Sequence, residues 1–291
     1  MRVFVTGATG FIGSAVVPEL LRAGHEVVGL ARSDASAQAL VGAGAEVHRG
    51  SLDDLDGLRA AASAADGVIH LAFVHDFANF AESARTDLRA IESFGEALAG
   101  SGRPLVVASG TLILRGAEEE PSELFGPRMA GVRATLAAAE RGVRASVVGL
   151  PPSVHGDSDA GFVPRLIQIA RETGVSGYVG DGANRWPAVH RFDAATLFRL
   201  AVEKAPAATI LPTVADEGIP TRTIAEVIGR RLNVPATSIE PEKTVDHFGW
   251  IGPFFALEGA ASNASTRELL GWEPTRPGLL EDLEQGYYFD E

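Results

Sequence analysis

The sequence has 291 residues, of which 46% are hydrophobic, so it can bury one large core or a main domain with a smaller one attached. A formal net charge of −13 predicts repulsion from phosphate backbones and anionic membranes, so we expect neither a nucleic-acid nor a membrane partner. Cysteine is absent, which excludes disulfides and thiolate chemistry, and neither a secretory signal nor a membrane-spanning run is recognisable, so we expect a cytoplasmic protein.

Through the first 150 residues, short β-branched runs alternate with amphipathic stretches rich in Ala and Leu, which is the pattern of strand–helix units feeding a parallel sheet. Strands are predicted at 2–6, 26–30, 46–49, 67–71, 105–109 and 144–150, and helices at 11–23, 36–43, 55–62, 80–99 and 124–141. The strands at 67–71 and 105–109 are apolar on both faces, as expected when helices cover both sides of a sheet. The predicted fold class is therefore α/β, with a doubly wound parallel sheet.

Beyond Pro151 the segments are shorter and punctuated by Pro and Gly, with helices predicted at 163–172, 194–203, 223–232 and 266–270. Thr223 followed three residues later by Glu226 predicts a capping box for the third of these helices. We expect a dinucleotide-binding domain at 1–150 and a smaller, mainly substrate-binding part at 151–291. About 186–213 is expected to return to the sheet.

Three glycines with the spacing G-x-x-G-x-x-G directly follow the first predicted strand and open the first predicted helix. Gly7 permits a tight turn, Gly10 lets the main chain approach a pyrophosphate, and Gly13 lets the helix pack closely on the strand. The phosphates would then face N–H groups at a helix N-terminus. The predicted dinucleotide contacts in this turn are Gly7, Thr9, Gly10, Phe11, Ile12 and Gly13.

Arg32 ends the second strand, where an NAD enzyme places an acid on the ribose 2′-hydroxyl. A guanidinium can instead pair with a 2′-phosphate, and Ser33 can add a hydrogen bond, so the sequence favours NADP(H) over NAD(H). The alternative is that Arg32 is a solvated charge and Asp34 takes the ribose, because helix capping also explains Ser33 and Asp34.

The segment 6–13 resembles the fingerprint of the extended and atypical short-chain dehydrogenases/reductases, which include the NAD-dependent epimerases and dehydratases. The segments 50–53, 68–72, 151–156 and 180–193 resemble later motifs of the same family, so the resemblance spans at least residues 1–193. It implies a Rossmann-like fold. It also implies adenine contacts from Ser51, which stands where the family has Asp, and Leu52, and contacts near the ribose and nicotinamide from Leu71, Ala72, Phe73 and Pro151.

In this family a Tyr-x-x-x-Lys pair carries the proton chemistry, and the family spacing places it at Phe125 and Met129. The chain has no Tyr before Tyr178 and no Lys before Lys204, so it cannot build the pair. Phe125 is then expected to line the substrate pocket.

Other groups are candidates for the missing chemistry. Ser109 and Thr111 follow the fifth strand and are predicted to position a substrate oxygen, with hydroxyls bonded to nearby backbone as an equal alternative. His75 and His155 follow the fourth and sixth strands, where strand ends frame a ligand crevice, so we expect proton donation from His75 and a substrate contact from His155. Alternatively, a conjugated alkene, an iminium or a flavin accepts hydride and takes its proton from solvent.

Arg185 matches an arginine that holds substrate phosphate in sugar-nucleotide enzymes, and with Trp186 beside it a substrate contact and a surface ion pair are equally supported. His190 resembles a structural histidine of the fold. The aromatic stretch 247–255 suits a hydrophobic lid or, as we prefer, core packing. No residues have metal-ligand spacing, so no metal is expected. The resemblance implies that the helices at 80–99 and 124–141 pair two subunits in a homodimer.

These observations predict an atypical NADPH-dependent reductase, an oxidoreductase that passes hydride to a small, largely apolar substrate without a Tyr/Lys pair. The first alternative is a non-catalytic NADP(H)-binding regulatory protein or sensor. The second is a sugar-nucleotide epimerase or dehydratase, which is less favoured because those reactions also begin by deprotonating a hydroxyl.

Overall fold

A computed structural model describes residues 1–76, 79–115 and 126–290 of the chain. They form two compact units. The first contains Met1–Gly149, Ala194–Pro212 and Ala264–Glu273, and the second contains Leu150–Asp193, Thr213–Asn263 and the chain from Pro274 onward. Phe125 lies outside the described residues.

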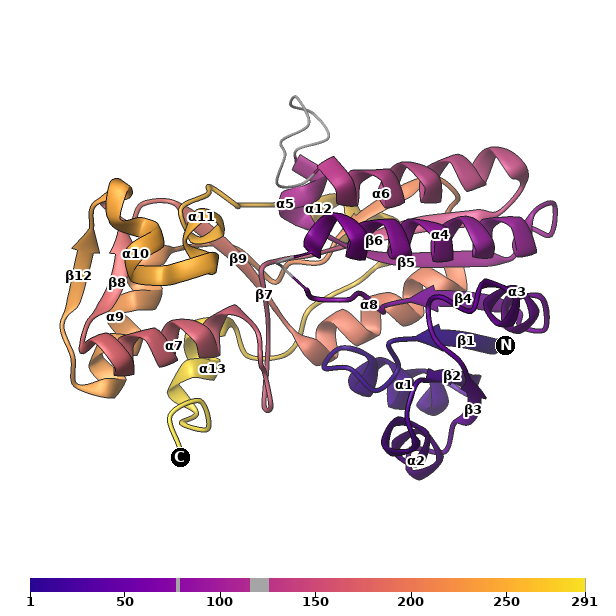
Figure 1. Ribbon diagram of the computed structural model, residues 1–291, viewed down its shortest axis with the longest axis horizontal. Helices are drawn as coiled ribbons and strands as arrows, with labels where there is room; N and C mark the ends of the chain where they lie inside the picture. The colour runs from indigo at the N-terminus through magenta and orange to yellow at the C-terminus, as the bar shows by residue number, and fades with distance from the viewer. Residues whose placement is uncertain (77–78, 116–125, 291) are drawn as a thin grey trace. The chain divides into compact units, whose positions relative to one another are not determined.

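A seven-stranded parallel sheet forms the centre of the first unit, in the order β10-β6-β5-β4-β1-β2-β3 (Figure 1). Its strands are β1 (Arg2–Thr6), β2 (Glu26–Ala31), β3 (Glu46–Arg49), β4 (Gly67–His70), β5 (Pro104–Gly110), β6 (Arg144–Leu150) and β10 (Thr209–Pro212). Because β1 pairs with both β2 and β4, the strand order reverses between β1 and β4, and ligands of such sheets bind beyond the carboxyl ends of the strands at that point. The predicted doubly wound α/β fold is confirmed.

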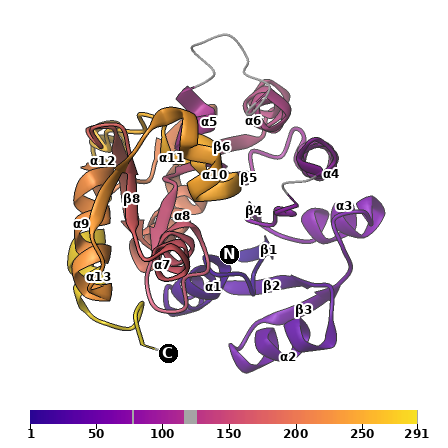
Figure 2. The same cartoon turned by 60° about the vertical axis from the view of Figure 1, so that its left-hand side comes forward.

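Helices of the first unit cover both faces of this sheet. They are α1 (Gly13–Arg22), α2 (Asp34–Gly42), α3 (Leu55–Ser63), α4 (Phe80–Leu98), α5 (Thr111–Arg115), α6 (Gly126–Ala138), the 3-10 turn η2 (Ala139–Arg141), most of α8 (Arg191–Lys204) and α12 (Ala264–Leu270). In Figure 2, α3, α4 and α6 follow one another along one face. Their apolar residues bury Phe4, Val68 and Leu105 of the sheet against Ile91 and Phe94 of α4.

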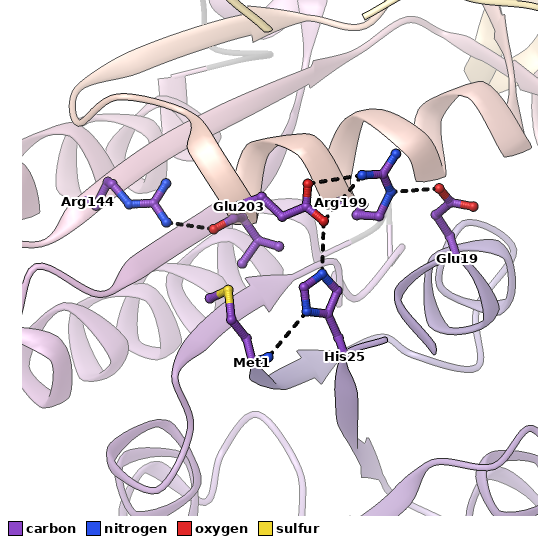
Figure 3. Close-up of polar contacts among 7 residues, drawn as sticks. Met1, Glu19, His25, Arg144, Arg199 and Glu203 are labelled. Atoms are coloured by element: carbon purple, nitrogen blue, oxygen red, sulfur yellow. Dashed lines mark hydrogen bonds and ion pairs between the residues drawn. The ribbon is translucent and has the colours of Figure 1, made fainter. Parts of the chain in front are cut away.

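The helix α8 is tied to the other face by charged side chains (Figure 3). Arg199 donates to Glu19 of α1 at 2.8 Å and pairs with Glu203 at 3.0 Å within its own helix. Glu203 also contacts Nε2 of His25, before β2, at 2.9 Å. Arg144 of β6 donates to the carbonyl oxygens of Val202, in the last turn of α8, and Ala205, directly after it, at 2.7 and 2.9 Å, where a positive charge also complements the helix dipole.

The second unit holds two smaller sheets. The strands β7 (Ser153–His155), β9 (Arg185–His190) and β11 (Asp216–Pro220) form one, and β8 (Ser176–Val179) and β12 (Ala236–Ile239) form the other. Its helices are α7 (Phe162–Thr173), α9 (Thr221–Leu232), η3 (Pro241–Lys243), α10 (Thr244–Phe248), η4 (Gly249–Ile251), α11 (Gly252–Phe255) and α13 (Leu279–Glu284). The core is aromatic: Trp186 packs on Phe255 at 4.9 Å between ring centroids, and Phe248 packs on Phe255 at 5.2 Å.

The structure differs from the expected chain path at residues 186–193, which form most of β9 and the start of α8 and belong to the second unit. Trp186 holds this strand there because its side chain is fully buried in that unit's core. The segments that return to the first unit are Ala194–Pro212 and Ala264–Glu273.

The capping box predicted at Thr223 and Glu226 is wrong. The helix α9 begins two residues earlier, at Thr221, with Pro220 as N-cap and no side-chain cap. The loop before β9 replaces the box, because the carbonyl oxygen of Asn184 accepts the N–H of Thr221 at 2.9 Å and another loop carbonyl accepts the next N–H. Among the described residues, no helix is long and apolar enough to cross a membrane.

Candidate cofactor and active site

The turn between β1 and α1 passes too close to its neighbours for side chains at two of its glycines. Gly7 has a φ of +66°, and a Cβ there would lie 2.7 Å from the backbone nitrogen of Ala72. A Cβ on Gly13 would lie 2.1 Å from the carbonyl oxygen of Gly7. Thr9 and Gly10 are exposed between them, and in the described chain no side chain caps α1. Main chain is thus presented at a helix N-terminus, which is the arrangement that binds phosphate.

The end of β2 carries the residues expected to choose between the two dinucleotides. Arg32 is exposed, and Ser33 caps α2 with its hydroxyl. Asp34 forms an ion pair with Arg49 at 2.6 Å, and Arg49 stands opposite Ala31 in the pairing of β2 with β3. Asp34, whose carboxylate could compete for a ribose hydroxyl, is therefore paired with Arg49. Arg32 directly follows the end of β2.

The other predicted cofactor residues of the first unit follow the carboxyl ends of β1, β3 and β4. All are half-buried except Leu52, which is 8% exposed and packs in the core: Phe11, Ile12, Ser51, Leu52, Leu71, Ala72 and Phe73. Their place along the sheet fits a dinucleotide that crosses the edge at the reversal of strand order.

A line of buried polar groups begins at the last residue of β1. Thr6 accepts the N–H of Ala72 through Oγ1 at 3.3 Å, and the same oxygen lies 2.6 Å from Nδ1 of His70. Nε2 of His70 lies 3.2 Å from a carboxylate oxygen of Asp87, in α4. The carboxylate can only accept, so His70 carries its proton on Nε2 and accepts the Thr6 hydroxyl at Nδ1.

Asp87 also forms a buried ion pair with Arg128, in α6. Burial by itself would raise the pKa of Asp87, but the charge of Arg128 and the hydrogen bond from His70 outweigh it and hold the pKa below its ordinary value. Arg128 donates a second hydrogen bond to the carbonyl oxygen of Ala108 at 3.1 Å and lies over the ring of Phe73, 4.0 Å from its centroid. The ionised pair therefore sits at the carboxyl ends of β4 and β5.

His75 is exposed beyond the end of β4, and its ring meets that of Phe73 at 5.3 Å between centroids. Partial desolvation and, next, the charge of Arg128 lower the pKa of His75. The imidazole is then mostly neutral at pH 7, which suits it to hydrogen bonding more than to acting as a charged acid.

Ser109 and Thr111 lie where β5 passes into α5. Both residues are buried, and neither hydroxyl has a hydrogen-bond partner among the described residues. Hydroxyls bonded to the nearby backbone, the alternative prediction, are therefore not observed in this part of the chain. A buried hydroxyl without a partner is costly, so both keep the capacity to bind a ligand oxygen.

The position counted for the family lysine lies in the apolar core. Met129 is 4% exposed and packs with Val132 and Val147. The preceding residue, Arg128, reaches Asp87 instead. Sequence reasoning missed both members of this ion pair. A signal for Asp87 was present, because its spacing places an acid on the apolar face of α4 that also carries Ile91, and such an acid needs a partner.

His155 is fully buried within the second unit, and its Nδ1 lies 2.7 Å from the Asp282 carboxylate. Its ring meets that of His190 edge to face at 5.4 Å. His190 in turn accepts the N–H of Phe192 at Nδ1, at 3.2 Å. A substrate contact from His155 stays a prediction.

Three further predicted residues also belong to the second unit. Pro151 is buried. Arg185 is exposed and pairs with Glu258 at 3.1 Å, whereas Trp186 is fully buried. The aromatic stretch expected as a lid or as packing contributes core residues, including Phe248. In the described chain no group of His, Asp and Glu could hold a metal ion.

Comparison with known proteins identifies the family of this fold and site. A model of the NAD dependent epimerase/dehydratase family matches residues 3–211, which is more than half of the chain. The chain belongs to this family. The resemblance expected from the glycine-rich turn and the later motifs is thereby confirmed, and the first unit is an NAD(P)-binding fold.

Relatives of known sequence and structure agree with this membership. A protein of Schizosaccharomyces pombe described as uncharacterised is 48% identical over 99% of this chain and 100% of its own. The 2-alkyl-3-oxoalkanoate reductase of Stenotrophomonas maltophilia is 31% identical over 70% of this chain and 66% of its own. The dTDP-glucose 4,6-dehydratase of Streptomyces venezuelae, solved with NAD and TYD bound, has a TM-score of 0.78 at 18% identity and covers 98% of this chain and 97% of its own. That last likeness shows the fold alone.

Proposed function

We propose that the protein is an NADPH-dependent reductase that transfers hydride to a small, largely apolar organic substrate without a Tyr/Lys pair. The observation that carries the proposal is the pair of buried hydroxyls on Ser109 and Thr111, which have no partner among the described residues. They lie where β5 ends and α5 begins, on the edge of the sheet where nucleotide ligands bind in this type of fold. The reductase among the relatives supports a carbonyl acceptor.

The cofactor preference rests on charge at the end of β2. Arg32 is exposed at the end of β2, where its guanidinium can pair with a 2′-phosphate. Asp34, the carboxylate that would compete for a ribose hydroxyl, forms an ion pair with Arg49 at 2.6 Å. These contacts support NADP(H) over NAD(H).

The chain's own residues divide the remaining work. The glycine-rich turn would hold the pyrophosphate, Ser51 and Leu52 the adenine, and Leu71, Ala72 and Phe73 the ribose and nicotinamide. The contact expected from Pro151 stays a prediction. When bound, the cofactor supplies the hydride. Ser109 and Thr111 would hold the acceptor oxygen, which provides much of the acceleration that positioning can give.

His75 would donate a hydrogen bond as part of the same proposal. The substrate contacts expected from Phe125, His155, Arg185 and Trp186 stay predictions. A cytoplasmic location and a homodimer accompany it, and each is open to direct measurement.

The test is NADPH oxidation by the full chain, followed by absorbance, across carbonyl, imine, enone and flavin acceptors. For an acceptor that turns over, Thr111→Val with Ser109→Ala should lower kcat/KM about tenfold or more, because two positioning hydrogen bonds are lost. The matched control is Thr135→Val, which removes a buried hydroxyl already bonded to Gly131 in its own helix. Equal losses in both variants would contradict a role in positioning.

Arg32→Ala is expected to weaken NADPH binding while leaving NADH binding nearly unchanged, and unchanged NADPH affinity would overturn the cofactor preference. Binding of NADPH without turnover of any acceptor would favour the alternative of a non-catalytic NADP(H) sensor. Epimerase or dehydratase chemistry stays less favoured because the chain has no Tyr before Tyr178.

A further inference from the structure

The ion pair between Asp87 and Arg128 is buried, and burying two charges costs free energy that their attraction does not clearly recover. The two side chains are 1% and 10% exposed. Removing both charges from water costs several kcal/mol, and the attraction between them often does no more than offset this. A cation placed so deeply in the chain therefore calls for a role besides stability.

The guanidinium is held in one orientation by direct contacts with Asp87 of α4 and Ala108 of β5. His70 and, behind it, Thr6 fix the Asp87 carboxylate that Arg128 meets, and the carbonyl oxygen of Ala108 accepts a second bond. The carboxylate can lie close to α6 because residue 131 is glycine, where a Cβ would lie 2.9 Å from Oδ2 of Asp87. A guanidinium fixed in this way meets a ligand with little reorganisation.

The same geometry puts Arg128 beside the groups already assigned to the acceptor. Ala108, which accepts its hydrogen bond, directly precedes Ser109, and the ring of Phe73 beneath it follows β4. Arg128, Ser109 and Thr111 thus share the carboxyl ends of β4 and β5 within one compact unit.

We propose that Arg128 is the catalytic residue that stabilises the negative charge developing on the acceptor oxygen, in place of a proton donor. The proposal rests on the reductase function proposed above. Hydride brings its electron pair to the acceptor carbon, and the π pair of the carbonyl moves to oxygen. Water then delivers a proton to that oxygen and leaves as hydroxide. NADPH is oxidised and the carbonyl is reduced. A guanidinium group does not act as a proton donor to an alkoxide in proteins, so it serves as a fixed charge and hydrogen-bond donor.

Asp87, His70 and Thr6 are positioning residues in this scheme, because they act through Arg128. Arg128→Met alone would leave an unpaired carboxylate in the interior, which risks unfolding. The main variant is therefore Arg128→Met combined with Asp87→Asn, which removes both charges together. Arg128→Lys keeps the charge without the planar fork. The matched control is Arg199→Met, which breaks the partly buried ion pair between α8 and Glu19 of α1.

For an acceptor that turns over, the double variant should have a kcat about 100-fold lower, the usual effect of one lost oxyanion donor. Its KM for NADPH should change little. Arg128→Lys should recover part of this loss, and Arg199→Met should show none of it. A folded double variant with unchanged kcat would overturn the role of Arg128 and leave the reductase function standing.

A second readout needs no turnover. Hexanoate and hexanamide have similar shapes, but only hexanoate carries the negative oxygens that imitate the developing charge. We expect the complex with NADP⁺ to bind hexanoate more tightly than hexanamide, and the double variant to lose this preference, as measured by calorimetry. This comparison tests the role of Arg128 even if no acceptor turns over. The same preference for hexanoate in the parent protein and the double variant would refute that role. Failure of the acceptor screen would instead count against the reductase function.

Discussion

Asp159 is a carboxyl group whose protonation is coupled to folding. It accepts the N–H of Gly161 at 2.7 Å and the hydroxyl of Tyr288 at 3.1 Å. Burial raises the pKa of Asp159 from an ordinary 3.8 to about 6. Because the folded-state pKa lies above the unfolded value, the folded protein binds the proton more tightly. The resulting stability is fully present below about pH 4 and is lost as the pH rises through 6.

Asp159→Asn should therefore stabilise the protein at pH 8 and not at pH 4. The amide stays neutral and can still accept from Gly161, so at pH 8 we expect Tm to rise by about 2–4 °C, which corresponds to about 1 kcal/mol after allowance for partial exposure. Thermal melts at the two pH values measure this. Asp157→Asn, at an exposed neighbour, controls for the loss of one formal charge. An equal gain at both pH values would contradict the linkage.

Single residues also mark where the sequence was insufficient. The counted position of the family lysine is Met129, yet the rotation of α6 turns Met129 into the core and Arg128 towards Asp87. Counting along a chain does not give the phase of a helix against a sheet, and one residue changes the direction of a side chain by about 100°. His70 belonged to a recognised motif, but its bond to Asp87 depends on a helix that follows it.

At the scale of elements, the alternating pattern predicted β1 to β6 and the long helices of the first unit, with ends displaced by a few residues, but it did not predict β10 or α5. Regular periodicity is a strong signal where buried strands alternate with long amphipathic helices. It fails where tertiary contacts decide. The start of α9 depends on carbonyls of the Asn184 loop, and β9 stays in the second unit because Trp186 is buried there.

The packing of α4 against α6 leads to a prediction at Gly131. A Cβ at Gly131 would lie 2.9 Å from Asp87 and 3.0 Å from Ile91, both on α4. Gly131→Ala should push the helices apart and lower the free energy of unfolding by about 1–3 kcal/mol, as overpacking does.

The matched control is Gly42→Ala in the last turn of α2, where an added Cβ meets nothing within 4 Å. That change should be neutral or stabilise by up to about 1 kcal/mol, because alanine favours a helix. Urea denaturation of both variants measures the difference. Similar effects for the two would show that α4 and α6 tolerate the extra carbon.

For the whole molecule, cofactor choice should appear in thermal stability. A ligand at about 100 times its Kd adds about 2.7 kcal/mol to the stability of the protein that binds it. We expect NADPH to raise Tm by several degrees and NADH at the same concentration to raise it less, with the difference abolished in Arg32→Ala. Differential scanning fluorimetry measures the Tm shifts with NADPH and with NADH, in the parent protein and in Arg32→Ala. A larger shift with NADH would reverse the preference.

The discontinuity of the first unit has a consequence for the growing chain on the ribosome. The strand β6 is finished by residue 150, but its neighbour β10 comes only at Thr209–Pro212, and the last segment of the unit ends at Glu273. Until β10 has been made, one edge of β6 presents unpaired N–H and C=O groups, the template on which strands of other chains add. The nascent chain must therefore be made as far as Glu273 before its nucleotide-binding unit can close, and that interval is when a chaperone would be of most use to it.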